Sequence, residues 1–346
     1  MSTQLFHYEQ PFMLESGQTL SGYHLAYTTL GKMNSTQSNV VWVFHALTAN
    51  SDPSEWWPGL VGEGKLLDPK NHYIICVNMP GSCYGSIGPL EKNPQSGKPW
   101  YHGFPLFTTR DMIHAYQPLC KALGIGKIHL GLGGSMGGQQ LLEWAIEEPE
   151  RFEHIIPIAT NAQHSPWGIA FNASQRMCIE NDPTWKESFN EAGIEGMKVA
   201  RSLALLSYRH YEAYNITQPR DKKAPWPAPH PYGGEAAESY QRYQGEKLGK
   251  RFNAFSYYRL SQGMDAHDLA RGRGSISEAL GSIKARTLSV GISSDILFPP
   301  TEQETIARHI PGASFACIDS FYGHDGFLLE YEKLEKLIRE FLASEQ

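Results

Sequence analysis

The chain has 346 residues, of which 41% are hydrophobic, 12% are aromatic and only 19% are charged. This composition excludes an intrinsically disordered chain, which needs high charge and few aromatic residues. The 36 acidic residues outnumber the 30 basic ones, and the formal net charge of −6 argues against a nucleic-acid-binding protein, which needs a basic face.

Short apolar runs, each followed by a turn rich in glycine or proline, predict buried β-strands along the chain. These runs cover residues 40–47, 72–79, 127–132, 154–160, 286–291 and 314–318. Amphipathic patterns between them predict helices over residues 109–123, 136–148 and 301–309. Continuous apolar strands suit a sheet covered on both faces, and their alternation with helices predicts a mainly parallel α/β sheet.

The alternation stops after residue 160 and resumes only near residue 286. Residues 196–214 and 235–263 between these points have helical patterns. The stretch 221–234 is so rich in proline and glycine that no regular element is expected there. We therefore interpret this part of the chain as a helical insertion rather than as a second sheet.

The strongest local motif is G-x-S-x-G, formed by Gly133, Ser135 and Gly137. It follows an apolar strand and precedes an amphipathic helix, which is the context of a nucleophile elbow. Such a turn holds the serine in a strained backbone conformation that small neighbours permit. The hydroxyl then projects at a helix N-terminus, where N–H groups stabilise a developing anion. A phosphate-binding loop or a plain tight turn is the alternative, and we predict that Ser135 is a nucleophile.

A serine hydroxyl is a weak nucleophile and needs a base and an orienting acid. In α/β-hydrolase-fold enzymes these follow the serine in the order acid, then histidine. Asp295 follows the strand predicted at 286–291, and His324 follows the last predicted strand, with a glycine beside it. Asp319 is an alternative acid, but it lies so close to His324 in sequence that we expect it to cap a strand end. We therefore predict a triad of Ser135, Asp295 and His324.

An oxyanion hole in such a site uses the N–H of the residue after the nucleophile and one from a loop after an early strand. The first donor is then Met136. The segment 45–48 ends the strand predicted at 40–47, and Leu47 is our candidate for the second donor. We interpret His45 in the same segment as a packed residue at a strand end rather than as a participant in the chemistry.

The positions of the triad residues along the chain distinguish two separate domains from one domain that is interrupted by an insertion. Ser135 precedes the helical insertion, whereas Asp295 and His324 follow it. We predict an α/β-hydrolase fold, with a mostly parallel central sheet and its core in residues 1–160 and 286–346. Residues 161–285 then form a helical lid that can roof the site.

Several blocks resemble the homoserine O-acetyltransferase family of methionine biosynthesis, in order and over nearly the whole chain. They include HALTAN, FPLFTTRDMI, GGSMGGQQLLEW, ARSLALLSYR and YGHDGFLLE. The resemblance implies an α/β-hydrolase core with a helical lid, and commonly a homodimer. It implies ping-pong transfer of acetyl from acetyl-CoA to L-homoserine through an acyl-serine, with nucleophile Ser135, acid Asp295 and base His324. Neither a bound cofactor nor a metal is expected, and acetyl-CoA is a cosubstrate.

The resemblance also implies a homoserine clamp made of Arg201, Tyr208 and Asp325. Positions 201 and 208 are seven apart and share one face of a helix. A guanidinium can hold an α-carboxylate through two hydrogen bonds, and Asp325 can hold the α-ammonium. From the residues alone, Arg201 could equally be a solvated residue paired with an acid, and Arg209 and Arg176 would be equal candidates.

The same set of residues is also compatible with other activities. Many relatives have glycine where this chain has Ala49, beside the acyl site, so a succinyl donor is an alternative, as is serine as the acceptor. An esterase could use the same triad. A non-enzymatic binding module is a further alternative, although such a module has no reason to keep all three triad residues.

The cellular compartment follows from what the sequence lacks. Residues 1–17 show neither the basic nor the apolar region of a signal peptide, and no stretch approaches the ~18 apolar residues of a membrane span. The five cysteines are scattered and show no C-x-x-C spacing, so we expect mostly buried, reduced thiols. We therefore expect a cytoplasmic enzyme that acts on small molecules and associates with neither membranes nor nucleic acid.

Overall fold

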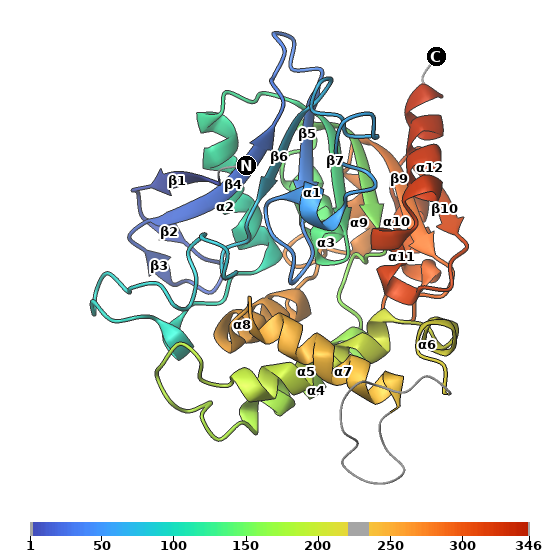
Figure 1. The fold of residues 1–346 in the computed structure, drawn as a ribbon. Helices are drawn as coiled ribbons and strands as arrows, with labels where there is room; N and C mark the ends of the chain where they lie inside the picture. Colours follow the sequence, from blue (N-terminus) through green and yellow to red (C-terminus); the bar gives the residue numbers. More distant parts are fainter. Residues whose placement is uncertain (1–2, 221–234, 345–346) are drawn as a thin grey trace.

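A central sheet organises the computed structural model of the protein, which describes residues 3–220 and 235–344 (Figure 1). Within the described residues its strands follow the order β1-β4-β6-β5-β7-β8-β9-β10. Their bounds are β1 Gln4–Tyr8, β4 Tyr23–Leu30, β5 Val40–Phe44, β6 Tyr73–Val77, β7 Ile128–Gly134, β8 Phe152–Ile158, β9 Arg286–Ile292 and β10 Ser314–Ile318. Strands β5 to β10 run parallel, as predicted, whereas β1 and β4 are antiparallel.

Strand β5 explains why the sheet is covered on both sides. All five of its residues are buried, and alternate side chains point to opposite faces. Trp42 and Phe44 belong to one apolar cluster, whereas Val41 and Val43 belong to another. The two faces are covered by helices α1 Pro53–Trp56, α2 Thr109–Ala122, α3 Met136–Glu147, α9 Ile276–Gly281, α10 Pro300–His309, α11 Gly326–Leu329 and α12 Tyr331–Ala343.

The N-terminal edge of the sheet was not predicted from the sequence. Strand β4 pairs with β6 on one side and with β1 on the other. A small two-stranded sheet of β2 (Phe12–Met13) and β3 (Thr19–Leu20) lies in the connection between β1 and β4. Strand β1 is largely exposed, so it lacks the continuous apolar run that identified the parallel strands.

Further helices lie together at one end of the sheet, between β8 and β9 along the chain (Figure 1). They are α4 Pro166–Glu180, α5 Ile194–Tyr208, α6 Tyr211–Thr217, α7 Ala236–Gly249 and α8 Ala254–Asp265. Helix α4 was missed, although Ser165 and Pro166 form a recognisable helix start, with the serine hydroxyl accepting from Gly168 N. The division into a core and a lid stays a prediction.

The two long helices predicted in the insertion are both interrupted. Residues 196–214 form α5 and α6, because Arg209 adopts an extended conformation and His210 caps α6. Residues 235–263 form α7 and α8, with Asn253 capping α8 by accepting from Ser256 N. The stretch 221–234, expected to be irregular, lies outside the described residues. No helix in the described ranges combines the length and apolar character needed to cross a membrane.

Candidate active site

Ser135 lies in the tight turn between β7 and α3. Its backbone has φ 57° and ψ −128°, a left-handed conformation that is strained for a residue with a side chain. A Cβ atom at Gly133 would lie 2.4 Å from Gly137 O, and one at Gly137 would lie 2.2 Å from Phe44 O. Because these contacts leave no room for a methyl group, the turn requires glycine at both motif positions.

Neighbouring strands hold this turn in place. Ser135 N donates to Ile158 O at 3.0 Å, and Thr160 Oγ1 donates to Ser135 O at 2.8 Å. Both partners come from the end of β8 and the residues after it. The side chain of Ser135 is 6% exposed, so its hydroxyl is nearly enclosed by the protein.

Asp295 and His324 meet in a buried hydrogen bond. The distance from Asp295 Oδ2 to His324 Nδ1 is 2.6 Å, and each residue is 3% exposed. The other carboxylate oxygen, Oδ1, accepts from the backbone N–H groups of Leu297 and Phe298 at 2.8 and 2.9 Å. The carboxylate is therefore fixed from both sides and can hold the imidazole in one orientation.

The loop that carries His324 packs against the helices below the sheet. Gly323 has φ +71°, and a Cβ there would lie 2.8 Å from His210 N. The imidazole ring lies 5.8 Å from the ring of Tyr208 and 5.2 Å from that of Phe327, between centroids. Phe327 also touches the elbow, since a Cβ at Gly134 would lie 2.4 Å from its ring.

A hydrogen bond joins two of the three predicted triad residues, whereas Ser135 is connected to them only by packing. Asp295 binds His324, whereas no hydrogen bond between described residues joins Ser135 Oγ to His324. The elbow and the histidine loop meet at Phe327 instead. Catalytic hydrogen bonds are often long in the free enzyme and shorten when substrate binds. The alternative acid, Asp319, is exposed and accepts from Ser293 Oγ at 3.1 Å.

The two predicted oxyanion donors lie at the ends of β5 and β7. Met136 is the first residue of α3, and a helix supplies no internal acceptor for its first N–H groups. Leu47 lies in a turn closed by the hydrogen bond from Ala49 N to Ala46 O at 3.0 Å. In the described part of the chain, no backbone hydrogen bond uses the Leu47 N–H.

His45 fastens the loop that carries Leu47. Its Nε2 accepts from Met79 N at 3.1 Å, so the proton of the neutral ring is on Nδ1, which lies 2.9 Å from Ala46 O. Burial lowers the pKa of His45 to about 4, so the ring is neutral at pH 7. These contacts give His45 a packing role at the strand end.

Two of the three residues predicted to form the clamp, Tyr208 and Asp325, lie next to His324. Arg201 lies 5.3 Å from the centroid of the Tyr208 ring, which in turn contacts the His324 ring. Burial raises the pKa of Tyr208 even though the Arg201 charge opposes this, so its hydroxyl is protonated at pH 7. Asp325 Oδ2 forms an ion pair with Arg209 Nε at 2.8 Å.

The three candidate arginines differ in their partners. Arg176 forms an ion pair with Asp265 at 2.6 Å, and Arg209 pairs with Asp325. Among the described residues, Arg201 has no carboxylate partner. Its guanidinium is therefore the one of the three whose charge is not already balanced by an acid in the part of the chain that the structure describes.

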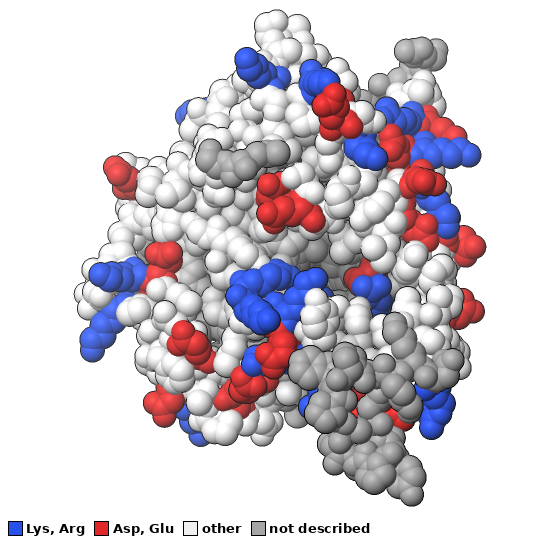
Figure 2. All heavy atoms as spheres, in the orientation of Figure 1, with Lys and Arg blue, Asp and Glu red and all other residues white. Residues whose placement is uncertain are grey.

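Sequence reasoning missed two contacts across the site. The pair of Arg209 and Asp325 was not predicted, because the two residues are 116 positions apart. They come together only because the chain is extended at Arg209, between α5 and α6. Sequence reasoning also missed Arg251, between α7 and α8, whose Nη1 donates to Thr48 O at 2.5 Å. The sequence signal for Arg251 is a local run of basic residues, and Figure 2 shows basic side chains over the end of α7, beside a depression in this face.

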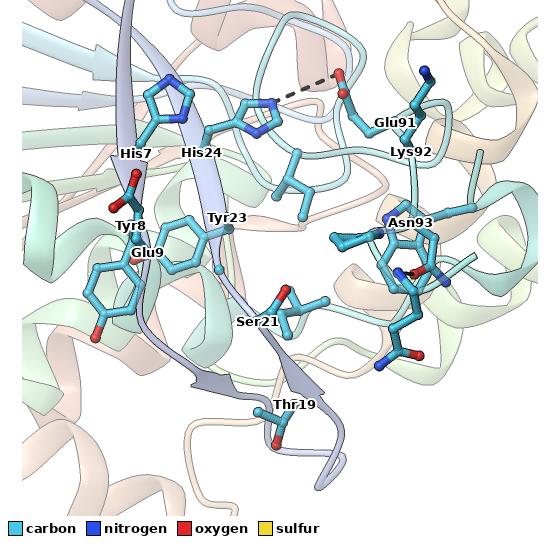
Figure 3. A pocket seen from close by; sticks show the side chains of 16 residues that line it. His7, Tyr8, Glu9, Thr19, Ser21, Tyr23, His24, Glu91, Lys92 and Asn93 are labelled. Atoms are coloured by element: carbon cyan, nitrogen blue, oxygen red, sulfur yellow. Dashed lines mark hydrogen bonds and ion pairs between the residues drawn. The ribbon is translucent and has the colours of Figure 1, made fainter. Parts of the chain in front are cut away.

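Two other features lie away from the triad. His129, Glu153 and His154 place possible metal ligands within 4.8 Å of one another, but they lie at the starts of β7 and β8, opposite to Ser135. A hollow of about 350 Å³ lies between β1, β4 and the segment 87–100 (Figure 3). None of the predicted site residues lines this hollow.

Comparison with known proteins connects this geometry to a family. Residues 39–331 match the model of the alpha/beta hydrolase fold. A homoserine O-acetyltransferase of Cyclobacterium marinum is 45% identical over 343 residues, covering 99% of this chain and 95% of that protein. Another from Chlorobaculum tepidum is 40% identical, covering 98% of this chain and 94% of that protein.

Solved structures extend the comparison to the fold. The homoserine O-acetyltransferase from Bacillus anthracis superposes with a TM-score of 0.89 at 25% identity, covering 99% of this chain and 97% of that one. Esterase E22 superposes with a TM-score of 0.87 at 22% identity, covering 99% of each chain, which shows a shared fold alone. The fold therefore serves both transfer and hydrolysis, and the side chains of the site must distinguish the two.

Proposed function

This chain belongs to the homoserine O-acetyltransferase family of α/β-hydrolase-fold proteins, and on that premise we propose that it transfers acetyl from acetyl-CoA to L-homoserine. The product, O-acetyl-L-homoserine, belongs to methionine biosynthesis. The observation that carries the proposal is Arg201, a guanidinium without an acid partner among the described residues, which lies against the Tyr208 ring that in turn contacts His324. A simple esterase has no need of such a cation one side chain away from its base.

In the first half-reaction Ser135 takes the acetyl group. His324 Nε2 removes the hydroxyl proton as Oγ attacks the thioester carbon, and Asp295 stabilises the imidazolium. The N–H groups of Leu47 and Met136 stabilise the oxyanion, and losing one such donor typically costs on the order of 100- to 1,000-fold in rate. The carbon–sulfur bond then breaks, His324 protonates the departing thiolate, and free coenzyme A leaves behind acetyl-Ser135.

In the second half-reaction homoserine takes the acetyl group from Ser135. His324 removes the proton from the homoserine hydroxyl as its oxygen attacks the acetyl carbon. The bond to Ser135 Oγ breaks, and His324 returns the proton to that oxygen. The enzyme is thereby restored, and acetyl-CoA is consumed as a cosubstrate in a sequence that requires neither a bound cofactor nor a metal.

The clamp selects an amino acid as the acceptor. Arg201 holds the α-carboxylate with two parallel hydrogen bonds, and Asp325 holds the α-ammonium. The ion pair between Arg209 and Asp325 supports this role, because the guanidinium holds the aspartate carboxylate in place. Together these contacts bring the side-chain hydroxyl of the substrate towards Ser135.

Water competes with homoserine for acetyl-Ser135, so transfer depends on orientation and exclusion. An oriented acceptor reaches an effective molarity of up to ~10⁵–10⁸ M. The helices of residues 161–285 act as a lid over the site, and Tyr208 forms part of its inner wall. The Tyr208→Phe variant, which keeps the ring, should form O-acetylhomoserine and acetate in the wild-type ratio, whereas Tyr208→Ala should release more acetate. An unchanged ratio in Tyr208→Ala would remove the support for this role.

The protein acts as a homodimer in the cytoplasm. Nine of the fourteen exposed large apolar side chains among the described residues lie within 161–285, for example Val199, Leu206 and Tyr211. Exposed apolar side chains that form a contiguous patch are typical of interaction surfaces, and we propose such a patch on this segment. Light scattering should give a dimer mass that falls to a monomer mass in Val199→Glu/Leu206→Glu, and a monomeric wild type would contradict the proposal.

The test of the proposed reaction crosses two donors with two acceptors. Acetyl-CoA and succinyl-CoA are each combined with homoserine and serine, and thiol release and product mass are measured. The proposal predicts the fastest thiol release for acetyl-CoA with homoserine, and O-acetylhomoserine as the product. Faster reaction with succinyl-CoA or serine would assign a different substrate, and acetate as the main product would indicate a hydrolase.

A further inference from the structure

A basic cluster lies where the oxyanion loop meets the helices. Lys247, Lys250 and Arg251 are exposed and fall within five residues at the junction of α7 and α8. Figure 2 shows basic side chains gathered over this junction, beside a depression in this face of the protein. Arg251 Nη1 donates to Thr48 O at 2.5 Å and also to the hydroxyl of Tyr84. Because Thr48 follows Leu47, the cluster borders the place where the thioester carbonyl binds in the proposed reaction.

The three cations differ from others in the same helices. Lys198 forms ion pairs with Glu195 and Glu246, and Arg209 pairs with Asp325. None of Lys247, Lys250 and Arg251 forms an ion pair within the described ranges. Arg242 on α7 forms an ion pair with Glu238, but that pair lies a turn or more from the cluster.

The cluster is positively charged although the chain as a whole is negatively charged. The whole chain has a net charge of −6, yet this junction places three positive charges together. Glu55 is an acid near this border, since its charge acts on the same Tyr84 hydroxyl as the charge of Arg251 does. Asn50 Nδ2 donates to Glu55 at 2.8 Å. Lys247, Lys250 and Arg251 outnumber this one acid, and a positive border suits an anionic ligand.

We propose that Lys247, Lys250 and Arg251 bind the phosphate groups of the acetyl-CoA donor. This inference rests on the proposed function, because it assigns the part of the donor that lies outside the acyl site. The donor arm then runs past Thr48 to Ser135, and its nucleotide end stays at the protein surface. Arg251 uses one Nη for Thr48 and Tyr84, and its other N–H groups bind a phosphate oxygen, while the lysines act as point charges.

The test distinguishes the binding of the donor's phosphate groups from the binding of the rest of the donor. S-Acetylpantetheine keeps the thioester and the arm but lacks the nucleotide and its phosphates. In Lys247→Gln/Lys250→Gln, the ratio of kcat/KM for acetyl-CoA to kcat/KM for S-acetylpantetheine should fall about 3- to 10-fold at low salt. The difference should shrink at high salt, because salt screens exposed charges. The matched control is Lys121→Gln/Lys127→Gln, which removes two exposed lysines elsewhere and should keep the wild-type ratio.

A calorimetric titration with coenzyme A makes the result independent of acyl transfer. Its affinity should fall by the same factor in Lys247→Gln/Lys250→Gln and stay unchanged in the control. An unchanged ratio and affinity, or an equal loss in the control, would overturn the phosphate site while leaving the transfer reaction intact. Weaker binding in the test variant, together with a wild type that makes no O-acetylhomoserine, would instead refute the proposed function.

Discussion

The sheet and the helices α4–α8 contribute different groups to the site. Ser135, Asp295 and His324 follow the ends of strands, and each is at most 6% exposed. The helical segment instead supplies Arg201 on α5 and Arg251 after α7, together with most of the exposed apolar side chains. The reacting groups are thus buried and held in place by neighbouring residues. The groups proposed to bind the substrates lie instead on the helices, outside the sheet.

The largest effect is expected from Ser135→Ala, which removes the nucleophile from the sheet. Loss of a serine nucleophile costs on the order of 10⁴- to 10⁶-fold in rate, because the remaining groups only bind substrate and stabilise the oxyanion. Thiol release from acetyl-CoA measures this loss. Ser16→Ala, at an exposed serine, should keep the wild-type rate. Residual activity near the wild-type level in Ser135→Ala would place the chemistry elsewhere.

Arg201→Ala tests the contribution of the helices. We expect the KM for homoserine to rise roughly 10- to 100-fold, since a charged hydrogen-bonding partner of the carboxylate is lost. Acetyl-enzyme formation from acetyl-CoA alone should stay near the wild-type rate, as measured by a burst of thiol. Arg242→Ala, which breaks an exposed ion pair with Glu238 on α7, is the control. An equal loss in both half-reactions would show that the clamp is assigned wrongly.

Gly137→Ala tests how tightly the elbow is packed. The new methyl group would lie 2.2 Å from Phe44 O, so β5 and α3 must move apart. Overpacking of this kind typically costs about 1–3 kcal/mol, which urea unfolding can measure. Gly103→Ala provides the comparison, because no atom lies within 4 Å of its added Cβ. Equal stabilities of the two variants would contradict the packing explanation.

The last effect appears only at low pH and concerns His267, which joins the two regions by hydrogen bonds to Thr109 Oγ1 and Asn161 O, both at 3.1 Å. Burial lowers the pKa of His267 to about 3, so below pH ~6.5 the unfolded chain binds the extra proton and the folded protein does not. Its contribution to stability is therefore complete above pH ~6.5 and decreases towards pH 3, by at most about 1.4 kcal/mol per pH unit.

The measurement for this prediction is the free energy of unfolding between pH 7 and pH 4. His267→Gln should reduce its decline towards low pH, whereas His7→Gln, at an exposed histidine, should leave the decline unchanged. A decline in His267→Gln as steep as that of the wild type would show that other groups dominate the acid sensitivity.

The sequence predicted the sheet better than the helices for a physical reason. An apolar run in the sequence indicates a strand that is buried on both faces. The elbow needs small residues only at Gly133 and Gly137. The strands and the elbow can therefore both be predicted from residues that are close together in the sequence. The break between α5 and α6 depends on contacts of Arg209 with Asp325 and of His210 with Gly323, which are more than 100 positions away. The exposed strand β1 gave no apolar run, and the contact of Arg251 with Thr48 depends on the tertiary fold.

The central claim is that one acetyl group passes through Ser135 from acetyl-CoA to homoserine. Its most direct test is mass spectrometry of the protein after brief mixing with acetyl-CoA alone and then with homoserine. The account predicts one acetyl group on the peptide that contains Ser135, and its quantitative transfer to homoserine in the second step. An unmodified Ser135 under conditions where product still forms, or an acetyl group that homoserine cannot remove, would contradict it.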